Sequence, residues 1–179
     1  MAGRLYENLP TNYSVYYSVL EFFRQLLSLH PSIQRVTYGD IRELDLDNFP
    51  QYPIANVEIT DCEFVDKKTI YSVKLLILDK IHNKDEYSSG SLNTQTEDFW
   101  KTTDEVDIHA NTLSVMNDFI SFVRRGTTNF DIQGGVRCIA VKEEYPNNLA
   151  GWGADFRLET PNDGNICLFD FSTALDENC

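Results

Sequence analysis

The sequence has few cysteines, few basic residues and no long apolar run, and these are features that define several large protein classes. It has four cysteines, at positions 62, 138, 167 and 179, with no CxxC pair and no histidine at metal-ligand spacing. This spacing argues against a zinc site and favours buried free thiols, which fit a reducing compartment. No unbroken apolar run exceeds the four residues of 75–78, whereas a membrane-spanning helix needs about 20. The first residues also lack the basic and apolar layout of a signal peptide, so we expect neither a membrane span nor export by that route.

Basic residues are scarce as well. Lysine and arginine number 15 against 28 aspartates and glutamates, which gives a formal net charge of -13 at pH 7. Tight binding to DNA depends on lysine and arginine displacing counterions from phosphates, so DNA is not expected as a tightly held ligand. The chain is nevertheless 42% hydrophobic and 12% aromatic. This is the composition of a packed globule, and the length of 179 residues predicts a single domain over 1–179.

The sequence contains none of the common catalytic motifs. GxxxxGK[ST], GxGxxG, GxSxG and HExxH are all missing, and only three histidines occur, His30, His82 and His109. His109 is two residues from Asp107, so on a helix the two side chains would not face each other. We expect His109 to be hydrogen-bonded or solvent-facing. No catalytic residue, metal ion or cofactor is predicted.

Hydrophobic spacing predicts seven elements in the order α-β-β-β-α-β-β. The first helix covers 13–30, and the second starts at a capping box formed by Thr102 and Glu105 and stops at Gly126. The predicted strands are 33–38, a hairpin of 55–65 and 69–81, then 136–142 and 152–159, with a last short strand or arm at 166–171. The stripe expected to pack inward on the second helix is Val106, Ala110, Leu113, Met116, Ile120 and Val123. This order predicts an α+β fold with a twisted antiparallel sheet flanked by two long helices.

Several bulky residues fall outside the pattern of a simple two-layer domain. Val15, Tyr17 and Phe22 lie off the apolar stripe of the first helix. Such residues either form a second contact surface or are covered by another layer of the same chain.

Two segments are predicted to act as arms. The polar loop at 82–103 is longer than compact domains normally carry, and a C-terminal arm at 161–179 follows the last predicted long strand. Large aromatic residues on arms usually dock, either on their own subunit or on a neighbour. We therefore expect four interface residues: Phe99, Trp100, Phe169 and Phe171.

Short motifs add a family resemblance over about residues 10–168. They are a His-Pro step after the first helix, Tyr38-Gly39-Asp40, a proline-rich segment at 49–57, Leu92-Asn93-Thr94-Gln95, Leu149-Ala150-Gly151-Trp152 and Pro161-Asn162-Asp163. With these motifs the chain resembles tailed-bacteriophage virion proteins of the tail-terminator or tail-completion type, such as those of crAss-like and related phages.

The resemblance implies a structural role without catalytic residues. It implies an α+β subunit of a homo-oligomeric ring, of six or twelve copies, that contacts neighbouring neck or tail rings or the portal protein. Such a protein is made in the host bacterial cytoplasm and resides in the virion, and DNA passes through its lumen during packaging and ejection without specific binding. Acidic residues could line the lumen and repel phosphates, or they could only keep the free subunit soluble.

Two other functions remain open at this point. A small cytosolic hydrolase-type enzyme would use an acid pair such as Asp61 and Glu63, or His109 with a carboxylate from elsewhere in the chain. A monomeric acidic module that mimics DNA would carry carboxylates spaced along one face.

Overall fold

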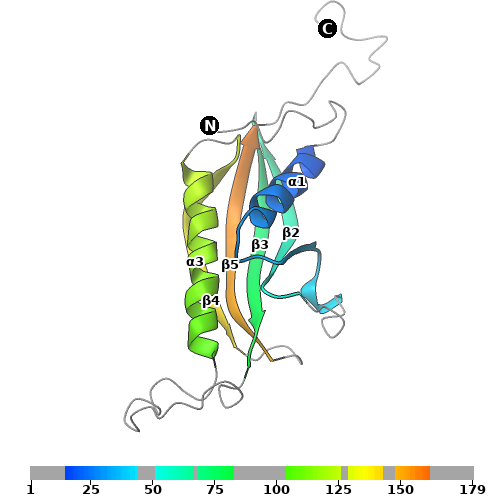
Figure 1. The fold of residues 1–179 in the computed structure, drawn as a ribbon. Coiled ribbons are helices and arrows are strands. Elements are labelled where there is room, and N and C mark those ends of the chain that lie inside the picture. The colour runs from blue at the N-terminus through cyan, green and yellow to red at the C-terminus, as the bar shows by residue number, and fades with distance from the viewer. Residues whose placement is uncertain are drawn as a thin grey trace, which may run out of the picture.

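The computed structural model describes residues 15–43, 51–66, 68–82, 104–125, 129–142 and 148–161. The elements in this part of the chain are α1 (Val15–Ser28), β1 (Arg35–Tyr38), the short 3-10 helix η1 (Ile41–Glu43), β2 (Ile54–Val65), β3 (Lys68–Lys80), α3 (Glu105–Arg124), β4 (Asp131–Lys142) and β5 (Leu149–Pro161) (Figure 1). Neither helix in these ranges has the length and apolar character needed to cross a membrane.

The five strands form one mixed sheet in the order β1-β2-β3-β5-β4. β2, β3, β5 and β4 pair with antiparallel neighbours, but β1 pairs with β2 in parallel, with Arg35 opposite Ile54. The prediction of an antiparallel sheet is therefore wrong. A parallel pair needs a connection long enough to return the chain to its starting end. The connection from Gly39 to Pro53, which includes η1, has that length.

Both helices cover the same face of the sheet, as Figure 1 shows. Their buried residues share one core with the sheet; Phe23 of α1, for example, stacks on Phe119 of α3 with ring centroids 5.3 Å apart and contacts Phe156 of β5. The helices have 14 and 20 residues. The prediction of a sheet flanked by two long helices is thus also wrong, because periodicity shows that a helix has an apolar stripe and does not show which sheet face receives it.

In the part of the chain that the structure describes, the second face of the sheet is only partly covered. A small apolar cluster lies there, in which Ile41 of η1 packs on Ile54, Leu76 and Leu78. The alternate residues Ser72 and Lys74 of β3 are half-exposed on this face. Because polar side chains in the middle of a strand tolerate contact with water, this face needs no helical layer to cover it. Both α1 and α3 can therefore pack on the first face.

The predicted hairpin at 55–65 and 69–81 is confirmed by β2 and β3. A register shift between Ile59 and Asp61 interrupts the ladder, and every residue from Thr60 to Asp66 is exposed. We call residues 60–66 the hairpin arm. Ile59 still packs against the core, and the six residues from there to Val65 extend roughly 20 Å at the usual rise of a strand.

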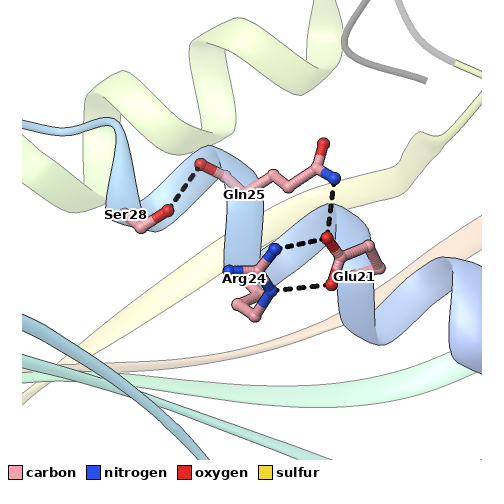
Figure 2. A network of polar contacts seen from close by, with 4 residues as sticks. All are labelled: Glu21, Arg24, Gln25 and Ser28. Carbon is pink, nitrogen blue, oxygen red and sulfur yellow. Dashed lines mark hydrogen bonds and ion pairs between the residues drawn. The ribbon is translucent and has the colours of Figure 1, made fainter. Parts of the chain in front are cut away.

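Phe22 is one of the residues off the predicted stripe of α1, and it is buried. Its ring stacks on Phe130 with centroids 4.3 Å apart, so the same chain covers it and α1 presents a broader apolar face than the stripe indicated. Tyr17, in contrast, is 59% exposed. On the polar side of α1, Glu21 accepts hydrogen bonds from Arg24 and Gln25 (Figure 2), and the guanidinium of Arg24 lowers the pKa of Glu21.

Candidate functional site

The four aromatic residues predicted at interfaces, Phe99, Trp100, Phe169 and Phe171, lie outside the described residues. The same holds for Thr102 of the predicted capping box and for the strand expected at 166–171. The candidate sites described below lie on the helices, the sheet and their connections within the described ranges.

Asp61 and Glu63, the candidate acid pair, both lie on the hairpin arm and are exposed. The carboxylate of Glu63 forms an ion pair with Arg157 of β5, and Asp61 accepts a hydrogen bond from the backbone N–H of Cys62 at 2.8 Å. Each carboxylate thus has its own partner on an open strand surface. This arrangement is that of a solvated strand face rather than of a general acid and base that converge on a substrate.

A polar junction ties the end of β3 to the start of α3. Asp104 precedes α3, and its Oδ1 accepts a hydrogen bond from the backbone N–H of His82 at 2.8 Å. In return the N–H of Asp104 donates to the carbonyl oxygen of His82, and the Nδ1 atom of His82 is 3.4 Å from Asp104 Oδ2. A carboxylate at this position is also stabilised by the positive, N-terminal end of the helix dipole.

Glu105 and His109 lie one turn apart in the first half of α3 and face the sheet. The distance from His109 Nε2 to Glu105 Oε1 is 3.6 Å, and the two side chains are only 16% and 9% exposed. Lys142 Nζ of β4 is 3.9 Å from the same carboxylate oxygen. Trp152 of β5 donates a hydrogen bond from Nε1 to the carbonyl oxygen of His109 at 2.8 Å, and its ring meets the imidazole edge to face.

The expectation that His109 is hydrogen-bonded or solvent-facing is wrong. Among the described residues, neither imidazole nitrogen has a hydrogen-bond partner, and both are buried. The sequence analysis excluded Asp107 as the partner of His109 and did not consider Glu105, the i, i+4 neighbour that a helix brings to the same side. That spacing was the signal that could have located the pair.

Asp79 extends this junction on the sheet. In the strand register, Asp79 of β3 and Lys142 of β4 lie on either side of Ala150 of β5. Burial raises the pKa of Asp79, the nearby charge of Asp104 raises it further, and a hydrogen bond from the N–H of Lys80 opposes the shift. Within the described ranges no cluster of three or more histidine, cysteine, aspartate or glutamate residues could hold a metal ion. The junction is therefore a set of partly buried charges at the place where the start of α3 meets the sheet.

An apolar groove lies at a different place, between the end of α1 and the middle of α3. Its volume is about 270 Å³. Leu27, Val115 and Phe119 are core residues and form its floor, whereas Leu26 and Phe122 are half-buried and Leu29 is 63% exposed. Across its rim, His30 Nε2 is 3.4 Å from Asp118 Oδ2. Leu29, Leu26 and Phe122 thus leave an apolar opening on the surface between α1 and α3.

The stripe predicted for α3 is only partly right, and the groove was not predicted from the sequence. Of the residues expected inside, Met116 and Val123 are buried, but Leu113 is 38% exposed. Three apolar residues off the predicted stripe are buried as well: Ile108, and Val115 and Phe119, which belong to the core shared with the sheet and α1. These residues recur at i, i+7 and i+11, which is also helical spacing, and Phe122 continues the series to the groove.

Comparisons with known proteins add no assignment. No protein-family model matches the chain, and no curated protein matches it.

Proposed function

We propose that this chain is a non-enzymatic structural subunit that assembles head to tail with copies of itself into a ring in the neck or tail of a tailed bacteriophage. The observation that carries the proposal is the exposure of large apolar side chains at two separate places on the subunit. One is the hairpin arm, where Phe64 is 73% exposed, and the other is the groove beside Leu29. The family resemblance in the sequence supports the same conclusion.

The placement of the two surfaces favours a ring over a simple dimer. The hairpin arm belongs to β2 and the groove belongs to α1 and α3, so one surface does not overlap the other. A contact between two different patches leaves one free patch on each end of the assembly. Such head-to-tail contacts produce rings when the rotation between copies closes.

The net charge has a role in this proposal. Each copy contributes -13, so a ring carries a large negative charge in a small volume. Carboxylates that face a central hole repel DNA phosphates over about one Debye length, ~8 Å at physiological salt. DNA would then slide through the lumen without adhering to its wall.

A second candidate is a hydrolase-type enzyme that uses His109. The buried imidazole, 3.6 Å from the Glu105 carboxylate, has the residue types of a general base with an orienting acid. This reading predicts that His109→Ala abolishes hydrolysis of ester or phosphoester substrates by the purified protein. Ring assembly predicts instead that His109→Ala assembles as the wild type does and that neither protein hydrolyses these substrates.

The mass of the purified full-length chain tests the main proposal. We expect light scattering after size exclusion to give a mass that is a multiple of 20.6 kDa, and electron microscopy to show closed rings. In the assembled particle the lumen should be lined mainly by aspartate and glutamate. A protein that stays monomeric at its highest soluble concentration, alone and with purified phage tails and capsids, would contradict the proposal, as would a lumen lined by lysine and arginine.

A further inference from the structure

We propose that Phe64 of one subunit inserts into the groove between α1 and α3 of the next copy, so that the hairpin arm and the groove form the lateral contact of the assembly. This inference rests on the proposed function and names the partner surfaces within it. It concerns a specific pair of residues, Phe64 as the inserted side chain and Leu29 at the mouth of the groove.

The exposed position of Phe64 fits this role. The side chain is the most exposed of the large hydrophobic residues in the described ranges, at 73%. It pairs with Thr69 in the hairpin register, and alternation places it on the same side of the sheet as Tyr71, which belongs to the core under the helices. The phenyl ring is thus held on the end of β2, next to β3 and β5, and most of its surface is exposed.

The groove has the size and lining to accept that ring. A cavity of about 150 Å³ with apolar walls is enough to hold a benzene molecule, and the groove has a volume of about 270 Å³. Most of its lining consists of leucine, valine and phenylalanine side chains, and its polar side chains, His30 and Asp118, pair with each other at the rim. Burial of an exposed phenylalanine against such a surface contributes roughly 1.5–3 kcal/mol to each contact.

Charge complementarity supports the same pairing. On the arm, Asp61 and Asp66 are exposed, and no ion pair involves either of them within the described residues. On α3, Asp118, Phe122 and Arg125 are spaced by four and three residues and so lie along one side of the helix. Asp118 is paired with His30 at the rim, whereas Arg125 is exposed at the end of that row. A docked arm would bring its carboxylates toward this guanidinium.

Two variants separate the two halves of the contact. Phe64→Ser removes the inserted side chain and keeps the groove, whereas Leu29→Asp places a charge at the groove and keeps Phe64. Because both positions are exposed, neither substitution should unfold the subunit. We expect each variant alone to be monomeric. An equimolar mixture should form dimers only, because one intact arm then meets one intact groove and neither remaining surface can extend the chain.

The matched controls lie close to the tested residues. Val65→Ser changes the neighbouring residue on the opposite side of the arm, and Leu113→Asp places the same charge on α3 away from the groove. Both controls should assemble as the wild type does. Circular dichroism and thermal unfolding of every variant verify that the fold is retained.

The outcomes are distinguishable. If the wild type assembles and Phe64→Ser and Leu29→Asp assemble equally well, the arm-in-groove contact is refuted while the ring proposal stands. If the two variants stay monomeric when mixed, the contact is not between arm and groove, and the inference also fails. If the wild type itself never assembles, the ring proposal fails and the inference fails with it. Dimers that appear only in the mixture support the inference.

Discussion

A Cβ atom on Gly151 would lie 2.0 Å from the carbonyl oxygen of Ile77. Gly151 belongs to β5 and Ile77 to the central strand β3, next to Leu78, which is the partner of Gly151 in the ladder. The backbone of Gly151 also has φ of +155°. The close approach of these two strands, beside the buried Ala150 and Leu149, therefore depends on the missing side chain.

Gly151→Ala should destabilise the fold strongly. The added methyl group meets backbone atoms that cannot move without breaking the β3–β5 ladder, and the positive φ adds strain, so we expect a loss of about 3 kcal/mol. Urea unfolding followed by circular dichroism measures the change. Gly135→Ala is the control, since a Cβ there meets nothing within 4 Å. Equal stability of the two variants would show that the strands are not packed this closely.

Asp79→Asn should stabilise the protein at neutral pH. Burial raises the pKa of Asp79 in the folded state, so the folded protein disfavours the charged form that prevails at neutral pH. The favourable contribution of the protonated carboxyl is present below the unfolded-state pKa and is lost as the pH rises through the folded-state pKa. Asparagine keeps an acceptor for the N–H of Lys80 and removes the repulsion by Asp104.

The measurement for Asp79→Asn is the free energy of unfolding as a function of pH. The advantage of the variant should shrink as the pH falls into the range where carboxyl groups protonate. Asp61→Asn, on the exposed arm, is the control and should change little. A variant that is less stable than the wild type at neutral pH would mean that Asp79 is held by a favourable charge interaction instead.

Tyr16 should titrate later than an ordinary tyrosine. Burial and a hydrogen bond with the hydroxyl of Tyr38 raise the pKa of Tyr16 to about 12. Because this folded-state pKa exceeds the unfolded one, the stability that Tyr16 contributes is present below pH 10 and is lost between about pH 10 and 12. Phenolate absorbance during a pH titration measures this. Tyr16→Phe should remove one late-titrating group, and an unchanged titration curve would contradict the assignment.

Glu105→Ala should weaken the attachment of α3 to the sheet. The substitution removes the carboxylate that faces His109 and Lys142 and leaves the buried imidazole without its nearest charge partner. We expect a loss of about 1–3 kcal/mol. Thermal unfolding provides the measurement, with Asn117→Ala on the exposed side of α3 as the control. Loss of stability should occur without loss of assembly, because the groove lies elsewhere on α3.

Local pattern was sufficient to predict most of the elements. The hairpin of β2 and β3 followed from alternating residues around a polar turn, and both helices followed from apolar spacing and from stops at His30-Pro31 and near Gly126. The excess of acidic over basic residues and the absence of catalytic motifs could likewise be read from the sequence, since composition does not depend on folding. These features are properties of consecutive residues, so each segment by itself contains the information needed to predict them.

Contacts between distant segments were decided by the tertiary structure alone. The parallel pairing of β1 with β2, the placement of both helices on one face, and the meeting of Leu29 with Phe122 in a groove each join residues far apart in the chain. The same is true of Lys142 beside Glu105. An apolar stripe indicates that a helix buries one side. Only the packing of the assembled layers determines which residues that side contacts and which hydrophobic side chains remain in contact with water.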